Sequence, residues 1–308
     1  MTRYIVVRVL MMFVTMLVLV TISYFAMSFA TYEYYTELGF REYFSATWTS
    51  YKVYLWNIIT QWEFGVTGTE ETPPWDILLE YLGVSLKINL IAFAIYLPLG
   101  IVFGVICGIF RNSLFDRVFN FLALIINSIP IFILMFLFIF FLGFKLKFGH
   151  YQWVAGWGAR NYILPVLALI LAPIHRISRV IRSEVIETAT SEHILLARTK
   201  GMTHTQAMWR HTVRQSFAGV LHDLPGTFLY ALTGSIFVEI VYHIDGVAYL
   251  LVRSLLRISP VGGLYVFIEI EVVMVILMFY TMLSMVLNLL VDILLVIVDP
   301  RIRQELIK

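Results

Sequence analysis

The sequence predicts an all-α polytopic membrane protein with six transmembrane helices. Of its 308 residues, 60% are hydrophobic and 14% are charged, whereas soluble domains contain about 45–50% apolar and about 25% charged residues. The mean hydropathy is +0.85. The net charge of +2 gives no indication of a nucleic-acid partner. The single cysteine, Cys107, excludes an intrachain disulfide and a cysteine-based metal site.

Four runs without Asp, Glu, Lys or Arg are the strongest candidates for membrane spans. Each contains at least 20 residues, and a span needs about 20. The runs are Val9–Tyr32, Ile88–Phe110, Val118–Phe144 and Val272–Val291. The first run follows Arg3 and Arg8, but it is longer than the apolar core of about 7–15 residues in a signal peptide. We therefore expect it to be retained as the first span.

Two shorter apolar stretches, Asn161–His175 and Leu224–Val238, cannot be assigned from hydropathy alone. The segment between them is basic and contains Arg176, Arg179, Arg182, Arg198, Lys200, Arg210 and Arg214. If both stretches span the membrane, this segment lies in the cytoplasm, as the positive-inside rule prefers. The cytoplasmic side then carries 14 of the 22 Lys and Arg residues. The charge distribution thus favours six spans with both termini cytoplasmic.

The predicted topology has its longest outer segment directly after the first span. The spans are 9–31, 83–110, 118–144, 161–182, 217–242 and 264–297. The cytoplasmic segments are 1–8, 111–117, 183–216 and 298–308, and the extracytoplasmic ones are 32–82, 145–160 and 243–263. Between Tyr32 and Glu80 there are eight acidic residues but only two basic ones, Arg41 and Lys52. A loop of this length is more often functional than a plain connector, although its residues alone assign it no contact.

The longest cytoplasmic segment, 183–216, reads as two helices. The first continues inward from the fourth span to about Lys200, and Gly201 suits the left-handed position that follows a helix. Thr203 and Gln206 fit a capping box that opens a second helix over 203–214. Such a short amphipathic helix can dock into a groove of a soluble partner or lie on anionic lipid. The residues alone leave both interpretations open.

Several motifs in this and other segments occur together in one known family of proteins. The stretch Glu192–Met202, followed by His211 and Arg214, resembles the cytoplasmic "EAA" loop of ABC-importer permeases, in the form found in the oligopeptide, dipeptide and nickel branch. Further resemblances occur at Gly100 to Arg111 with Asp116-Arg117, Asn127-Ser128-Ile129-Pro130, Phe237–Tyr242 with Gly246, Asn288–Asp292 and Asp299–Arg303. These motifs occur in the family's order over roughly residues 75–303. The C-terminal form and the long first loop look most like the B-type subunit of an oligopeptide permease.

The sequence departs from the family pattern on its outer side. Asp245-Gly246 stands where the family has "P-G", and the early motifs "G-D-P" and "L-G-L-D-x-P" are not recognisable in Tyr32–Thr60. These changes affect the expected substrate and docking details more than the expected fold.

The resemblance implies a type I ABC importer permease fold with a cytoplasmic coupling helix, in the bacterial cytoplasmic membrane. It also implies two cytoplasmic ATPase subunits that bind ATP and Mg²⁺, a second homologous permease and an extracytoplasmic substrate-binding lipoprotein. This chain is expected to be no enzyme and to hold no cofactor or metal, and it contains no G-x-x-x-x-G-K-[ST] phosphate loop. The residues expected to couple it to the ATPase are Ala197, Arg198, Lys200, Gly201, Met202, Thr203, Gln206, Met208, Arg210, His211 and Arg214.

Four further residues are candidates for the translocation pathway: Asn127, Ser128, Pro130 and Glu239. An ionisable residue inside a span usually faces a cavity or a partner, and a polar kink in the third span needs hydrogen-bond partners. The alternatives are helix packing for the first three and an interfacial position for Glu239. Oligopeptides are the expected substrate, with dipeptides, nickel or a metal-chelator complex as alternatives. A standalone secondary transporter is the alternative from another class, although no pair of related halves is visible.

Overall fold

The computed structural model describes residues 2–30, 39–65, 72–149, 158–189, 191–209, 213–255, 257–259, 263–265 and 269–298. These residues are helical apart from loops and one hairpin of two short strands, β1 (Arg257–Ser259) and β2 (Gly263–Tyr265). Within the described residues, five helices are long and apolar enough to cross a membrane, and a bent pair of helices supplies the sixth span if it crosses as one. The predicted all-α membrane fold is thus confirmed. The chain divides into two compact units.

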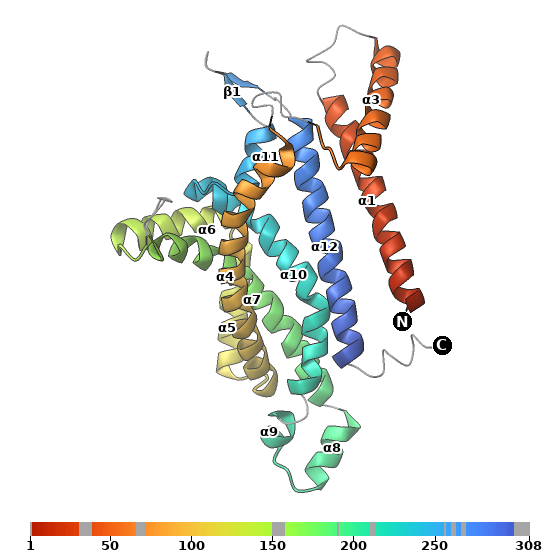
Figure 1. Cartoon of the computed structure of the whole chain (residues 1–308). Coiled ribbons are helices and arrows are strands. Elements are labelled where there is room, and N and C mark those ends of the chain that lie inside the picture. Colours follow the sequence, from red (N-terminus) through yellow and green to blue (C-terminus); the bar gives the residue numbers. More distant parts are fainter. Residues whose placement is uncertain are drawn as a thin grey trace. The chain divides into compact units, whose positions relative to one another are not determined.

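The first unit contains the residues up to Ser85 together with Asp245–Val286. Its first helix, α1 (Thr2–Ala30), lies beside α3 (Phe40–Gln61), which the sequence analysis did not predict (Figure 1). The ring of Phe25 lies 5.3 to 6.0 Å, centroid to centroid, from three aromatic rings of α3. Those rings belong to Phe44, Trp48 and Tyr51. The outer segment after the first span is therefore partly a helix that packs on that span through aromatic side chains.

The hydrophobic core of the first unit joins the end of α3 and the beginning of α4 (Pro74–Ile109) to α11 (Val247–Leu255) and α12 (Ile270–Val298). Its buried members include Ile58, Phe64, Leu78, Val247, Leu250 and Val275. The N-terminus of α11 is anchored on α4, because the Val247 N–H donates to Ser85 Oγ at 2.8 Å. This bond satisfies one of the backbone donors that a helix start leaves open.

The second unit contains Leu86–Ile244 and the end of α12. At its centre the antiparallel helices α7 (Arg160–Ala189) and α10 (Val213–Tyr242) lie side by side (Figure 1). Both extend beyond the predicted spans 161–182 and 217–242 at the ends that face the connecting loop. Three prolines lie inside these helices, which membrane helices tolerate because neighbouring groups satisfy the freed carbonyls.

Helix α4 approaches α7 closely along a stripe of glycines. A Cβ atom on Gly100 would lie 2.8 Å from the Ile177 Cβ, and one on Gly104 would lie 2.7 Å from the Ile181 Cβ. A Cβ on Gly108 would lie 2.6 Å from a side-chain carbon of Val185. Small residues allow such backbone approach where helices associate in membranes. This stripe therefore fixes the distance between α4 and α7.

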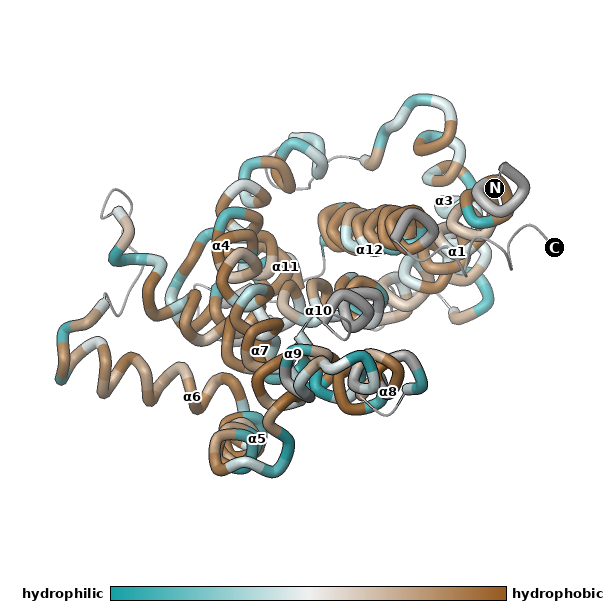
Figure 2. Tube along the Cα trace, turned by 90° about the horizontal axis from the view of Figure 1, so that it is seen from below, coloured by the Kyte–Doolittle hydropathy of each residue, from teal (hydrophilic) through white to brown (hydrophobic). Residues whose placement is uncertain are grey.

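The predicted third span, 118–144, is not one continuous helix. Helix α5 (Leu114–Ser128) and the following pair α6 (Ile131–Phe138) and η1 (Ile139–Lys145) meet at an angle of 101°. The break falls at Pro130, which has no N–H for a helical hydrogen bond. Figure 2 shows that apolar residues dominate α6. The polar and proline residues expected to bend this span thus lie at a sharp break.

The loop between α7 and α10 contains two further helices, α8 (Glu192–Thr199) and α9 (His204–Ala207). The prediction that one helix continues from the fourth span to Lys200 is wrong, because α7 ends at Ala189. The N–H of Ser191 donates to Thr188 O at 3.0 Å and closes a turn there. Of the helix predicted over 203–214, α9 forms the first turn and a π-helical turn follows at 208–209. Because residues 210–212 lie outside the described residues, the predicted end of this helix stays a prediction.

Candidate functional site

Gly201 ends α8 in the geometry that the sequence predicts. Its φ is +91°, a left-handed value that suits glycine because other residues would place a Cβ under strain. The Met202 N–H reaches back to Ala197 O at 3.3 Å, the bond that closes a helix whose next residue is left-handed. No atom lies within 4 Å of a Cβ built on Gly201. The backbone conformation, rather than space, therefore requires glycine at this position.

The capping box at the start of α9 is confirmed. The Thr203 N–H donates to Gln206 Oε1 at 3.2 Å, and the Gln206 N–H donates to Thr203 Oγ1 at 3.3 Å. This reciprocal pair satisfies two backbone donors at the helix start. Gly201 and the capping box together define a tight turn between α8 and α9.

The loop helices bury one set of side chains and expose another. Ala197 and Met208, both expected at the ATPase contact, are 6% and 1% exposed. Leu196 and Trp209, which the sequence analysis did not select, are 57% and 50% exposed. Lys200 and Gln206 are exposed as well. Ala197 and Met208 are thus covered by other residues of this chain. A partner protein would instead contact the exposed side chains.

Four of the expected coupling residues cannot be placed as side chains. Arg210 and His211 lie outside the described residues, and only the backbone is described for Arg198 and Arg214. Their expected roles therefore stay predictions. Trp209 could have been selected from the sequence, because it is the one tryptophan that the predicted topology puts in the cytoplasm.

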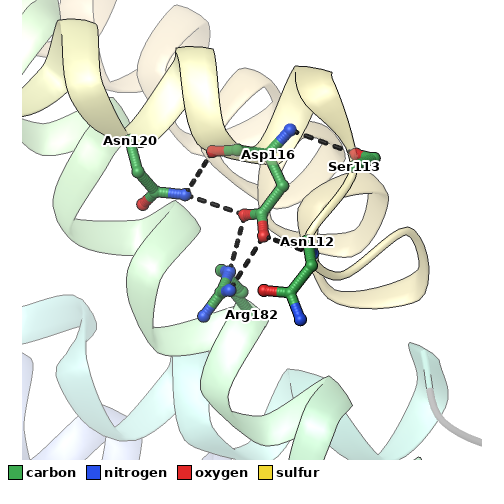
Figure 3. Close-up of polar contacts among 5 residues, drawn as sticks. All are labelled: Asn112, Ser113, Asp116, Asn120 and Arg182. Carbon is green, nitrogen blue, oxygen red and sulfur yellow. Dashed lines mark hydrogen bonds and ion pairs between the residues drawn. The ribbon is translucent and has the colours of Figure 1, made fainter.

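A buried ion pair ties the turn between α4 and α5 to α7 (Figure 3). Arg182 Nε and Nη2 donate to the two carboxylate oxygens of Asp116 at 2.8 and 2.9 Å. The same carboxylate accepts from Asn120 Nδ2 at 2.8 Å and from the Asn112 N–H at 2.9 Å. Ser113 Oγ accepts from the Asp116 N–H at 3.2 Å and caps α5. Asp116 is only 2% exposed, so this network supplies the partners that a buried charge requires.

A second ion pair joins α7 to α10. Arg176 Nε and Nη2 donate to Asp223 at 3.0 and 2.9 Å, and Thr227 Oγ1 donates to the same carboxylate at 2.8 Å. Its side chains are 42% and 26% exposed, more than those of the first pair. The sequence analysis counted these arginines only as positive charges. The pair could have been predicted from Asp223, because a carboxylate on an otherwise apolar helix needs a cation nearby.

The structure does not bring the four expected pathway residues together. Asn127 Nδ2 lies 3.1 Å from His175 Nδ1, while Pro130 stands at the break after α5. Ile131, the residue after Pro130, has its Cδ1 3.9 Å from a Cβ built on Gly234 of α10, five positions before Glu239. Asn127 and Ser128 are exposed, whereas Glu239 is 1% exposed. The four residues thus lie on α5, at the break after it and on α10, and they differ in burial.

The family model for the binding-protein-dependent transport system inner membrane component matches residues 100–304. The chain belongs to this family. It is therefore the permease subunit of an ABC importer and a multi-pass protein of the cytoplasmic membrane. This assignment replaces the alternative of a standalone secondary transporter.

Curated relatives of this permease carry peptide-transport names. The dipeptide transport system permease protein DppB of Lactococcus lactis is 31% identical over 258 residues, which cover 83% of this chain and 80% of the relative. The oligopeptide transport system permease protein OppB of Haemophilus influenzae is 27% identical and covers 98% of this chain and 100% of its own length. The alignment thus includes the outer segment in which the family motifs were not recognisable.

Solved structures show the same fold at low sequence identity. A chain of the inward-facing methionine ABC transporter MetNI matches with a TM-score of 0.55 and 17% identity, covering 73% of this permease and 97% of that chain. A chain of an amino acid ABC transporter with histidines matches with a TM-score of 0.52 and 18% identity, covering 71% and 92%. The predicted type I importer fold is therefore confirmed.

Proposed function

We propose that this permease forms half of a translocation pathway for oligopeptides, which an extracytoplasmic binding protein delivers. The similarity to an oligopeptide permease over 98% of the chain supports this substrate class. Dipeptides are the second candidate, because a relative at 31% identity is named for dipeptide transport. A series of peptides from two to six residues, offered in one uptake assay, separates the two candidates.

The loop between α7 and α10 is the proposed contact with the ATPase, in the cytoplasm. The observation that carries this proposal is the exposure of Leu196 and Trp209, at 57% and 50%, beside a turn held rigid by Gly201 and the capping box. Tryptophan is enriched among the residues that dominate protein interfaces. Lys200 and Gln206 would form the polar edge of the contact, and Arg198, Arg210, His211 and Arg214 are proposed to add charge to it.

The proposed assembly has a second homologous permease and two ATPase subunits, which bind the ATP and Mg²⁺. Both termini of this chain are placed in the cytoplasm, as the charge distribution favours. Motion of the loop would pass into α7, because α7 continues as a helix to Ala189 and the Asp116–Arg182 pair ties it to α5. Through this connection, movement of the ATPase would reach the membrane spans.

Glu239 is the residue we propose for the outer part of the pathway, near the end of α10. Its burial at 1% exposure supports contact with polar groups inside the protein, because a carboxylate in a span is costly without a partner. Asn127, Ser128 and Pro130 would act deeper, at the break between α5 and α6.

The test is ATP-driven peptide uptake by proteoliposomes that contain both permeases and both ATPases, with the binding protein added outside. The variant Leu196→Ser/Trp209→Ser should lose copurification with the ATPases and lose uptake. The matched control is Leu114→Ser/Trp56→Ser, which alters side chains of similar type that are 79% and 66% exposed elsewhere. Normal uptake by the loop variant would contradict the proposed contact, and absence of peptide uptake by the unaltered complex would contradict the proposed substrate.

A further inference from the structure

A cavity of about 380 Å³ lies in the first unit, between the end of α3 and the beginning of α4. Its walls include Trp62, Glu63, Phe64, Pro74, Trp75 and Asp76. None of the proposed transport residues belongs to it. In the proposed topology this cavity opens on the extracytoplasmic side.

The aromatic walls of the cavity are held in place by the backbone and by the core. Trp62 has a left-handed φ of 56° at the end of α3, and its N–H donates to Ile58 O at 3.2 Å. Phe64 is 4% exposed and its ring stacks on that of Trp75 at a centroid distance of 6.0 Å. The ring of Trp62 meets the same Trp75 ring edge to face at 6.4 Å and remains 59% exposed. A solvent-accessible indole thus stands beside a fixed aromatic pair.

The charges around the cavity are negative. Glu63 and Asp76 line it and are exposed, and its lining residues include no Lys, Arg or His. A third carboxylate stands behind Gly65, because a Cβ on that glycine would lie 3.0 Å from the Glu271 Cγ. Glu63, Asp76 and Glu271 together give the described surroundings of the cavity a negative field. Such a field attracts cations and disfavours anions.

Aromatic faces and carboxylates together are the surroundings that an organic cation prefers. Indole rings attract ammonium and guanidinium groups through the negative potential of their faces, and the carboxylates supply charge and hydrogen-bond acceptors. We propose that this cavity binds a primary alkylammonium group. Both the free N-terminus of a peptide and a lysine side chain on a partner protein carry that group. The inference rests on the proposed topology for its position outside the cell, but the binding chemistry does not depend on transport.

The test uses the full chain in detergent micelles, labelled with 5-fluorotryptophan and observed by ¹⁹F NMR. Addition of n-butylammonium chloride should shift the Trp62 and Trp75 resonances saturably, whereas the neutral N-butylacetamide should not. The variant Glu63→Gln/Asp76→Asn should weaken binding on the order of tenfold. The control Glu80→Gln removes an exposed carboxylate of α4 outside the cavity and should bind normally. An unchanged resonance of Trp48, whose ring stacks on Phe25 in the same unit, shows that each variant is folded.

Three peptides distinguish the source of the ammonium group: Ala-Ala-Ala amide, acetyl-Ala-Lys-Ala amide and acetyl-Ala-Ala-Ala amide. Saturable shifts with the first alone support a free peptide as ligand, and shifts with the second alone support a lysine of a partner protein. Shifts with both support recognition of the ammonium group itself. Equal shifts with the acetylated neutral peptide, or wild-type affinity in Glu63→Gln/Asp76→Asn, would overturn the proposal. The assay contains no ATPase, so its failure leaves the proposed import function untouched.

Discussion

Helices α1 and α3 of the first unit contact each other through aromatic rings, whereas α4, α5, α7 and α10 of the second unit contact each other through glycines and ion pairs. In the first pair, Phe25 touches three rings of α3. In the second group, Gly104 leaves no room for a Cβ, and Asp116 is bound at both carboxylate oxygens (Figure 3). Ring contacts tolerate small displacements, but a bidentate ion pair and a glycine contact hold one geometry. We therefore propose that these contacts make the helices of the second unit move together.

The largest expected effect comes from Asp116→Asn. This change removes the charge of the buried Asp116 and leaves Arg182, whose side chain is 28% exposed, without its anionic partner. Breaking a buried pair costs about 3–5 kcal/mol, and the partial exposure of Arg182 places the expected loss at the lower end. The melting temperature in detergent should fall sharply. Asp223→Asn is the comparison, because its pair is more exposed and should cost only about 1 kcal/mol. Equal losses in the two variants would show that burial does not distinguish these pairs.

The next effect is expected from Gly104→Ala. The added Cβ would stand 2.7 Å from the Ser178 carbonyl oxygen and from the Ile181 Cβ, and overpacking of this kind costs about 1–3 kcal/mol. Gly83→Ala on the same helix is the control, since nothing lies within 4 Å of its Cβ. Thermal unfolding of both variants measures the difference. A Gly104→Ala protein as stable as Gly83→Ala would contradict close packing of α4 on α7.

The smallest effect on the melting temperature is expected from Phe25→Ala, because it acts on α3 alone. Loss of the three ring contacts, each worth about 0.5–1.5 kcal/mol, should loosen α3 without unfolding the second unit. Limited proteolysis of the outer segment, followed over time, measures this loosening. Phe13→Ala, at a position 77% exposed on the same helix, should leave the cleavage rate unchanged. Faster cleavage in both variants would mean that the α1–α3 rings do not hold the segment.

The spans and the turn chemistry could be predicted from the sequence because both are local. Uncharged runs of about 20 residues mark spans, and Thr203 with Gln206 marks a helix start within four residues. Long-range partners could not be found in this way. Asp116 and Arg182 are 66 positions apart, and neither hydropathy nor charge counting pairs them. Helix α3 was missed because its buried positions, Thr47, Tyr51 and Ile58, are sparse among exposed aromatic residues.

The central claim is that the turn between α8 and α9 couples this permease to its ATPase, and one measurement tests it most directly. ATP-driven peptide uptake is compared between Gly201→Ala and Gly158→Ala. Both glycines have a positive φ, +91° and +67°, and neither has an atom within 4 Å of a built Cβ. Each alanine is strained by about 1–2 kcal/mol, more at +91° than at +67°, so uptake is compared per amount of inserted protein. Uptake should be lost in Gly201→Ala and retained in Gly158→Ala, with both proteins inserted. Normal uptake by Gly201→Ala, or equal loss in both variants, would contradict the claim.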